Sequence, residues 1–221
     1  MLLSKTNRLT FLLTIALIVV FVYFSYSYWF PKQPLPIYNP SSFNPELVDK
    51  SLQNKTRHHT VSDFNLINQN GESITQEVYK DKIYVTDFFF TRCGTICPIM
   101  TDNMAEIQKE FLNDDDIMLL SLSVTPEIDS VSVLRDYADT KGVIDSKWNV
   151  TTGNKKHIYN LARKSYFAAV EQGDGGLQDF IHTSNFILID KERQIRGIYD
   201  GTNADDIQQI IADIKRLKSS Y

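Results

Sequence analysis

An uncharged apolar run near the N-terminus constrains this chain most, because it divides the chain into two parts that require different surroundings. Residues 9–30 contain no charge, no Gly and no Pro, and a helix needs about 20 apolar residues to cross the ~30 Å hydrocarbon core of a bilayer. Lys5 and Arg8 precede the run and no acidic residue does, which favours a cytoplasmic N-terminus. The sequence therefore predicts a cytoplasmic segment over residues 1–8, one transmembrane anchor over residues 9–30 and an exported remainder.

A cleaved signal peptide is the alternative for this run. Such a peptide has a shorter apolar core and a small-x-small cleavage site, whereas this run closes on the bulky residues SYSYWF. Both alternatives place the rest of the chain beyond the inner (cytoplasmic) membrane, facing the periplasm or the cell exterior. The net charge is −4 and the sequence shows no basic stripe, which argues against a nucleic-acid partner.

Two regions follow the predicted anchor. Residues 31–57 include the Pro-rich stretch PKQPLPIYNPSSFNP, and Pro-rich linkers are extended and semi-rigid. Residues 58–221 are enough for one domain with a substantial core, since a domain of about 150 residues buries about 68–70% of its chain surface. The sequence therefore predicts an extended linker over residues 31–57 and a single folded domain over residues 58–221.

Strand-like and helix-like stretches alternate along this domain. Asn70-Gly71 is a turn signal within DFNLINQNGESI, and the runs IYVTDFFF, IMLLSLSV, KWNVTTG, NFILID and QIRGIYDG have the length of strands. Helical patterns follow Pro98, close at Gly142, begin again at Asn154 and start a last time at Asn203, a plausible N-cap. The alternation predicts a thioredoxin-like α/β domain whose largely parallel sheet is finished by an antiparallel hairpin.

Cys93 and Cys97 are the only cysteines of the chain, and they lie between a predicted buried strand and the start of a predicted helix. A spacing of four in a helical turn puts both thiols on one side of it, within the distance that a disulfide tolerates. The same proximity lets two thiolates bind one metal ion, and a helix N-terminus favours the thiolate. The pair can therefore be a redox switch, a metal site or both.

A purely structural disulfide is the alternative for this pair. Export permits disulfides, but a staple that closes so short a loop stabilises little, because the stabilisation grows with loop length. Among metals, structural zinc takes four N or S ligands, whereas soft thiolates select Cu(I). Two sulfurs and one imidazole suffice for Cu(I), so the available ligands favour copper.

The four histidines differ in their surroundings. His58 and His59 adjoin the predicted linker and His157 lies beside lysines, so surface positions are predicted for these three, with a second metal site at His58 and His59 left open. His182 follows the Gly-rich segment QGDGG and comes just before the strand NFILID. A residue there projects above the strand ends, where doubly wound sheets bind ligands. His182 is therefore the candidate third ligand.

Three stretches, TRCGTICPIM, SVTPEID and HTSNFILIDKERQIRGIYDG, resemble the SCO/SenC family of membrane-anchored copper chaperones for cytochrome c oxidase assembly. The resemblance runs from about Val61 to the C-terminus and implies a thioredoxin-like fold. It also implies that Cys93, Cys97 and His182 form a copper site that binds Cu(I) and, in many members, Cu(II). The implied partner is oxidase subunit II, whose dinuclear copper centre receives the metal.

The chain departs from the family pattern at an acidic position. The family's S-V-D-P-x-x-D reads SVTPEID here, so that Thr125 replaces the first acid while Asp129 keeps the second. Gly94 also stands where many members have Pro or another residue. The change at Thr125 weakens any role for a carboxylate there and leaves the three implied ligands untouched.

Other functions stay open for the same residues. A membrane-tethered thiol-disulfide oxidoreductase needs only the two thiols, although thioredoxins use Cys-x-x-Cys and carry a cis-proline that has no counterpart near His182; the family resemblance itself includes a thiol-disulfide role. A peroxidase is disfavoured because Arg92 is the only arginine near the pair in sequence. A copper or redox sensor is the third class. Metal loading needs a reduced pair, which predicts a thiol reductant protein as a second partner.

Overall fold

The computed structural model describes residues 5–29, 34–40, 59–169, 175–176 and 178–221, with side chains described for residues 10–25 in the first of these ranges. The chain forms two compact units, Met1–Pro34 and Leu35–Tyr221. The second unit contains every predicted strand and both cysteines.

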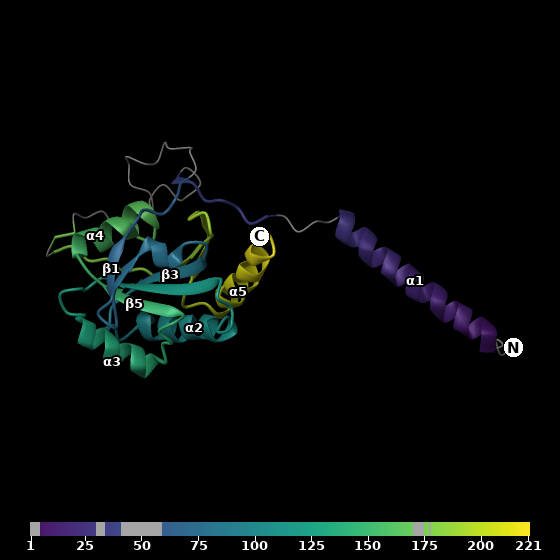
Figure 1. Cartoon of the computed structure of the whole chain (residues 1–221), viewed down its shortest axis with the longest axis horizontal. Helices are drawn as coiled ribbons and strands as arrows, with labels where there is room; N and C mark the ends of the chain where they lie inside the picture. The colour runs from purple at the N-terminus through teal and green to yellow at the C-terminus, as the bar shows by residue number, and fades with distance from the viewer. Residues whose placement is uncertain (1–4, 30–33, 41–58, 170–174, 177) are drawn as a thin grey trace. The chain divides into compact units, whose positions relative to one another are not determined.

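The first unit contains the helix α1 (Lys5–Trp29), shown in purple in Figure 1. Its Thr14 hydroxyl donates to the carbonyl oxygens of Thr10 and Phe11, at 3.1 and 2.8 Å, so this polar group is satisfied within the helix. Large apolar side chains such as Phe11 and Phe24 are exposed. No helix among the described residues combines the length and the apolarity that a membrane crossing requires. The transmembrane anchor over residues 9–30 therefore stays a prediction.

The second unit is built on one sheet. In the described residues the strand order is β2-β1-β5-β4-β3-β6-β7. The strands are β1 (Asn65–Asn68), β2 (Ser73–Thr75), β3 (Ile83–Phe89), β4 (Ile117–Ser123), β5 (Trp148–Thr152), β6 (Asn185–Ile189) and β7 (Ile195–Asp200). Only the pairs β3–β4 and β4–β5 are parallel, whereas β1–β2, β1–β5, β3–β6 and β6–β7 are antiparallel. The predicted hairpins are confirmed, but the prediction of a largely parallel sheet is wrong.

Helices cover both faces of this sheet (Figure 1). They are α2 (Ile96–Glu110), α3 (Val131–Lys141), α4 (Lys155–Asn160) with a π-helical continuation (Leu161–Ser165), and α5 (Ala204–Lys218). Side chains alternate along β3: Val85 and Phe89 join the core under α2, α3 and α5, while Tyr84 and Phe88 join the core under α4. Burial on both faces explains why β3 reads as a nearly continuous apolar run.

Local signals set the helix boundaries as predicted. The α3 helix ends at Gly142, whose φ of 68° is the left-handed conformation that glycine adopts without strain. The α5 helix begins after Asn203, whose side-chain oxygen accepts hydrogen bonds from the backbone N–H groups of Asp205 and Asp206. These caps fix where α3 and α5 meet the strands beside them.

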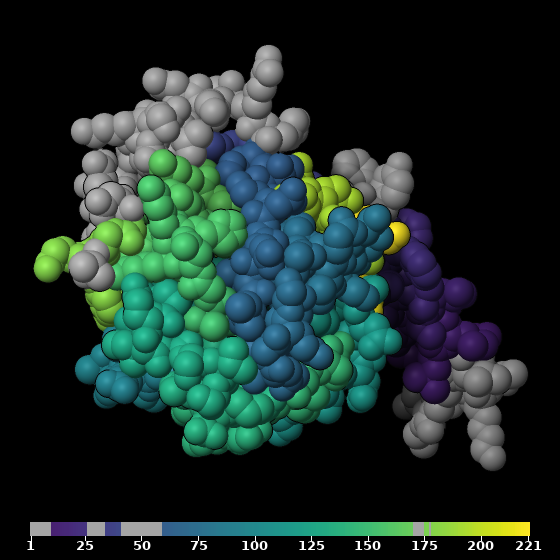
Figure 2. All heavy atoms as spheres, turned by 60° about the vertical axis from the view of Figure 1, so that its left-hand side comes forward, coloured from purple at the N-terminus to yellow at the C-terminus, as the bar shows by residue number. Residues whose placement is uncertain are grey.

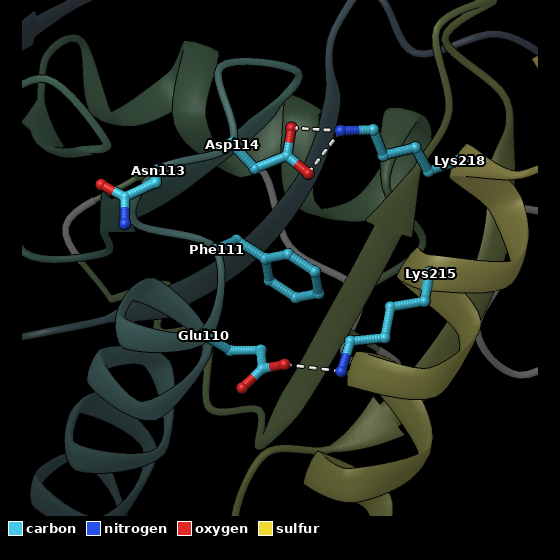
Figure 3. A pocket seen from close by; sticks show the side chains of 6 residues that line it. All are labelled: Glu110, Phe111, Asn113, Asp114, Lys215 and Lys218. Atoms are coloured by element: carbon cyan, nitrogen blue, oxygen red, sulfur yellow. Dashed lines mark hydrogen bonds and ion pairs between the residues drawn. The ribbon is translucent and has the colours of Figure 1, made fainter.

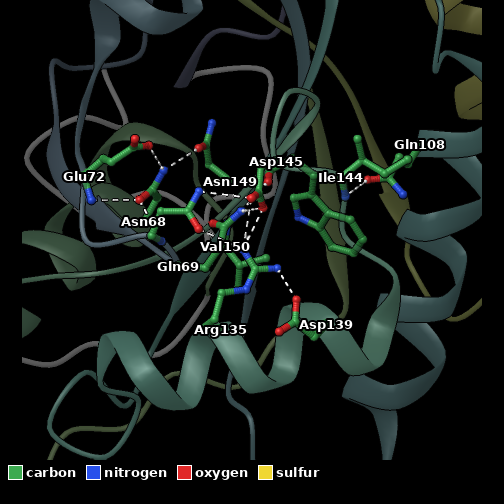
Figure 4. Close-up of polar contacts among 12 residues, drawn as sticks. Asn68, Gln69, Glu72, Gln108, Arg135, Asp139, Ile144, Asp145, Asn149 and Val150 are labelled. Atoms are coloured by element: carbon green, nitrogen blue, oxygen red, sulfur yellow. Dashed lines mark hydrogen bonds and ion pairs between the residues drawn. The ribbon is translucent and has the colours of Figure 1, made fainter.

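Buried polar side chains attach the β1–β2 hairpin to the rest of the sheet (Figure 4). The Gln69 Oε1 accepts from the Val150 N–H at 2.9 Å, and its Nε2 donates to Asp145 at 2.8 Å. Arg135 of α3 donates to the same Asp145 carboxylate. The Gln69 side chain thereby extends the ladder between β1 and β5, whose backbone pairing covers only two residue pairs.

The segment Leu35–Pro40 packs against β7. The Tyr38 N–H donates to the Ile195 carbonyl at 2.9 Å, and Leu35 is buried in the core. Arg196 donates to the Leu35 carbonyl at 2.7 Å while it pairs with the buried Asp190 at 2.9 Å. An extended linker was predicted for residues 31–57, but the described part of it from Leu35 onward belongs to the folded unit; residues 41–57 lie outside the described residues.

Candidate metal and redox site

The two cysteines meet at the junction of β3 and α2. After β3 the chain turns, with the Cys93 N–H donating to the Phe90 carbonyl at 3.3 Å, and Cys97 lies in the first turn of α2. The Cys97 N–H donates to the Cys93 Sγ at 3.4 Å. Both thiols are free, and Cys93 and Cys97 are 8% and 3% exposed. The predicted closeness of the two thiols is confirmed, but Cys93 lies in the loop before α2, whose N-cap is Thr95, and only Cys97 belongs to the first helical turn.

The surroundings divide the two thiols into one that ionises readily and one that resists ionisation. Partial burial alone would raise the pKa of Cys93, but hydrogen bonds from the Thr95 hydroxyl and the N–H groups of Cys97 and Thr95 outweigh it and lower this pKa to about 7. Burial raises the pKa of Cys97 to about 12, and the nearby Cys93 and Asp87 charges add to the rise. Near neutral pH the Cys93 thiol is therefore about half ionised, while Cys97 stays protonated.

This asymmetry predicts selective alkylation. Cys93 is expected to react with iodoacetamide at a rate that rises with pH through about 7, because only the thiolate is nucleophilic, while Cys97 stays unmodified near neutral pH. Peptide mapping by mass spectrometry after timed labelling at several pH values measures both rates. In the urea-denatured control both thiols should share one midpoint near the ordinary value of 9.0. Faster labelling of Cys97 in the folded chain would contradict the assignment.

The polar groups around Cys97 are two hydroxyl groups and one buried carboxyl group that is only partly charged near neutral pH. The Thr101 hydroxyl donates to the Cys97 carbonyl at 2.8 Å and lies 2.6 Å from the Tyr137 hydroxyl. Asp87 of β3 is buried and accepts a 2.5 Å hydrogen bond from Ser121. Burial outweighs this bond and raises the pKa of Asp87 to about 7. Among the described residues around Cys97 there is thus no buried cation that would stabilise its thiolate in the metal-free state.

A buried carboxylate holds the segment that leads into Cys93. Asp129 is 0% exposed and accepts hydrogen bonds from the Thr91 N–H (3.2 Å), the Thr91 hydroxyl (2.6 Å) and the Ser123 hydroxyl (2.6 Å). The Thr125 hydroxyl also donates to it, at 3.1 Å. Thr125, which replaces a family acid, therefore acts here as a donor to Asp129, and together these groups fix Thr91 two residues before Cys93.

His182 does not join the cysteines in this structure. It lies in the loop before β6 and is exposed. Among the described residues, no group of three or more His, Cys, Asp or Glu side chains is arranged to hold a metal ion. The structure thus brings together two of the three predicted ligands and leaves the third as a prediction.

The other histidines have partners in the fold. The His59 Nε2 lies 2.6 Å from the Ser165 carbonyl, its ring packs 4.5 Å from that of Phe167, and burial lowers its pKa. The His157 Nε2 accepts from the Asn65 N–H at 3.4 Å. Figure 2 shows the blue segment that begins after residue 58 lying beside the green segment that includes α4. His58 lies outside the described residues.

A pocket at the other end of α2 is not part of this site. It has a volume of about 390 Å³ and lies between the C-terminal ends of α2 and α5 (Figure 3). Two ion pairs cross it, Glu110 with Lys215 and Asp114 with Lys218, each at 2.5 Å. Its charged lining groups are therefore already paired, and the cysteines lie at the opposite end of the helix.

Sequence reasoning missed some groups that shape the site. Thr91 and Ser123 were not singled out, although Ser123 lies in the same SVTPEID stretch as Asp129. The ion pair between Arg163 and Asp179, beside the His182 loop, was missed as well. Thr91 and Asp129 are 38 residues apart in the chain, and neither helical nor strand periodicity pairs Ser123 with Asp129 or Arg163 with Asp179.

Comparisons with known proteins agree with this fold. The SCO1/SenC family model matches residues 52–219. A SCO1 protein homologue of Bacillus subtilis is 32% identical over 160 residues, which cover 72% of this chain and 82% of that protein. The structure of BsSco, titled a member of the Sco family of cytochrome c oxidase assembly proteins with a disulfide switch, has 32% identity and a TM-score of 0.61, covering 72% of this chain and 92% of that one.

Two further structures extend the comparison. A SCO1/SenC family lipoprotein from Bacillus anthracis has 31% identity and a TM-score of 0.64, covering 75% of this chain and 98% of that one. Bradyrhizobium japonicum ScoI with copper bound shares the fold at 23% identity and a TM-score of 0.57, covering 72% of this chain and 99% of that one. The thioredoxin-like architecture, the cysteine pair at the start of α2 and the match of the family model lead to one conclusion: this chain is a member of the SCO1/SenC family.

Proposed function

We propose that this protein is a membrane-anchored, extracytoplasmic copper-binding metallochaperone for assembly of the copper centre of cytochrome c oxidase. The observation that carries the proposal is the pair of free thiols, Cys93 and Cys97, which are in contact at the start of α2 and have unequal pKa values. Family membership supports the oxidase connection, because BsSco is a member of the Sco family of cytochrome c oxidase assembly proteins. Copper-bound ScoI, which shares the fold, is consistent with copper as the metal.

Copper suits this donor set for chemical reasons. Thiolates are soft ligands that select Cu(I), and binding must release the Cys97 proton, because metal ligands are deprotonated. The Cys93 thiolate, present near neutral pH, makes first contact with the ion, and the attraction of the bound cation then offsets the high pKa of Cys97. Binding of Cu(II) as well follows only from the family resemblance.

His182 supplies the third ligand in this proposal. It is exposed and apart from the cysteines in the metal-free structure, so its loop moves toward them when the ion binds. A ligand that joins last can also leave first. His182 would therefore open the site for transfer to subunit II of the oxidase.

Membrane anchoring by α1 is part of the same proposal. The segment over residues 9–30 is apolar and uncharged, and α1 exposes large apolar side chains between Phe11 and Phe24. Contiguous exposed apolar surface marks a membrane or protein contact. The anchor would make the chain single-pass and hold the domain beside the inner membrane, on the periplasmic or exterior side.

A thiol-disulfide oxidoreductase is the second candidate. The low pKa of Cys93 favours it, because a thiolate near neutral pH attacks disulfides. The disulfide switch named for BsSco also supports redox chemistry in a relative. This candidate requires both cysteines and no histidine, and both candidates need a protein that reduces the pair.

The His182→Ala variant tests the chaperone proposal. The reduced full chain in detergent is titrated with Cu(I) under anaerobic conditions against a chromophoric chelator. Wild type is expected to bind one copper per chain, and His182→Ala to bind it more weakly, because two sulfurs then lack the third ligand. His157→Ala is the matched control, since the His157 ring accepts a hydrogen bond from the Asn65 N–H of β1. Equal affinity of wild type and His182→Ala would overturn the proposal and favour the oxidoreductase.

A further inference from the structure

A buried ion pair lies next to the His182 loop. The two Arg163 Nη atoms donate to the two carboxylate oxygens of Asp179, each at 2.6 Å. The side chains of Arg163 and Asp179 are 10% and 8% exposed. Bidentate pairs of this kind fix geometry as well as charge, so the position of Asp179, three residues before His182, is set by Arg163.

The same pair is connected to the end of β3, the strand that precedes the cysteines in the chain. The Tyr159 hydroxyl lies within hydrogen-bonding distance of the Val124 carbonyl (2.9 Å) and the Asp179 carbonyl (3.3 Å). The Val124 N–H in turn donates to the Phe89 carbonyl at 2.8 Å, at the end of β3. The Arg163 guanidinium lies 5.3 Å from the centre of the Tyr159 ring. Asp179 is thereby tied to the segment that leads into Cys93.

The loop after Asp179 is attached on both sides of His182. The Phe180 ring packs edge-on against Phe90 with centroids 5.3 Å apart, and Ile181 is 1% exposed. Beyond His182, the Ser184 carbonyl accepts from the Gly201 N–H at 2.7 Å. His182 thus stands at the centre of a short arch, exposed between fixed ends.

The local backbone explains how Arg163 and Asp179 meet. Arg163 lies in the π-helical turn Leu161–Ser165 that continues α4, and such turns are frequent at functional sites. The Gly175 N–H donates to Asp179 at 2.7 Å, and Gly175 has a φ of +76°. A Cβ at Gly175 would stand 3.0 Å from the Lys156 backbone. This glycine of the Gly-rich segment is therefore required for close packing on α4, in addition to any role in loop movement.

We propose that the Arg163–Asp179 ion pair is the positioning element that fixes the base of the His182 loop, so that only the short arch has to move when His182 joins Cys93 and Cys97, and that the pair thereby controls how strongly His182 contributes to copper binding. The inference rests on the proposed function and adds two residues to it. Fixing the ends of the arch removes conformational freedom before the metal arrives, and less of the binding free energy is then lost in ordering the loop.

The variants Asp179→Asn and Arg163→Lys test this proposal. Asp179→Asn keeps the shape and removes the charge, while Arg163→Lys keeps the charge and removes the two-pronged donor. Each is expected to lower Cu(I) affinity roughly tenfold, within the 10–100-fold range found when groups that orient metal ligands are changed. Asp145→Asn is the matched control, because Asp145 also pairs with an arginine, Arg135, but on α3.

The decisive measurement repeats these titrations in the His182→Ala background. If the pair acts through His182, Asp179→Asn and Arg163→Lys have no further effect on copper affinity there. Equal loss in both backgrounds, or no loss in either, overturns the proposal. If the single variant His182→Ala binds copper as tightly as wild type, His182 is not a ligand and the proposed function fails. This outcome differs from the two that overturn only the role of the ion pair. Thermal unfolding of each variant shows whether a loss of copper affinity comes from loss of the fold. If Asp179→Asn unfolds, the milder Arg163→Lys variant provides the test.

Discussion

The Cys97→Ser variant is expected to bind no Cu(I) at chelator concentrations that leave wild type half loaded. A serine hydroxyl is a hard ligand that stays protonated, whereas the site depends on two soft thiolates. Cys97 is 3% exposed in the first turn of α2, and serine is nearly isosteric, so the fold should persist. The measurement is the anaerobic competition titration of the reduced full chain in detergent.

Thr101→Ser is the control for this substitution. Thr101 is 3% exposed one turn further along α2, and serine keeps the hydroxyl that donates to the Cys97 carbonyl. This variant therefore perturbs the same buried region without removing a sulfur, and it should bind copper as wild type does. Wild-type copper affinity in Cys97→Ser would show that the pair is not the metal site and that its chemistry is redox alone.

The Asp129→Ala variant is expected to lose about 3 kcal/mol of unfolding free energy. The carboxylate accepts four hydrogen bonds from Thr91, Ser123 and Thr125, and each buried donor left without a partner costs about 1–3 kcal/mol. The three hydroxyl groups can rotate toward other acceptors and avoid most of this cost, so the total is set mainly by the Thr91 N–H and stays at about 3 kcal/mol. The corresponding fall in melting temperature is about 6–12 °C for a domain of this size.

Urea denaturation followed by circular dichroism measures this loss, with Asp136→Ala as the control. Asp136 is an exposed aspartate of α3, and exposed substitutions of this kind usually change stability by less than about 0.5 kcal/mol. Asp129→Ala should also make the pH dependence of Cys93 alkylation less sharp, because Thr91, two residues before Cys93, is no longer held in place. An unfolding free energy equal to that of Asp136→Ala would show that the four bonds contribute little.

The elements with local signals were predictable from the sequence. The apolar run of β3, the stop of α3 at Gly142 and the Asn203 cap of α5 all follow from residues within one turn or strand. Strand direction has no such signal. The pairs β1–β5 and β3–β6 are antiparallel because of how long connecting segments pack, and a period of two residues reads the same in either direction.

The candidate site shows the same division. The closeness of Cys93 and Cys97 was predictable from their spacing of four, although Cys93 lies in the loop before α2 and not in a helical turn. The position of His182 depends on an arch held by Arg163 and Asp179, which the π-helical turn Leu161–Ser165 brings together. One extra residue in a helical turn leaves no periodic pattern, so neither the pair nor the exposed setting of His182 could be read from the sequence.

The segment Leu35–Pro40 has a consequence for solubility. In the described part of the sheet, β7 is the outermost strand beyond β6, and an open strand edge is a template for edge-to-edge association between chains. The bridge from Tyr38 to Ile195, with Arg196 holding the Leu35 carbonyl, occupies part of this edge. A fragment that began after Pro40 would therefore uncover both the β7 edge and the core position of Leu35, and it would invite aggregation that the longer chain avoids.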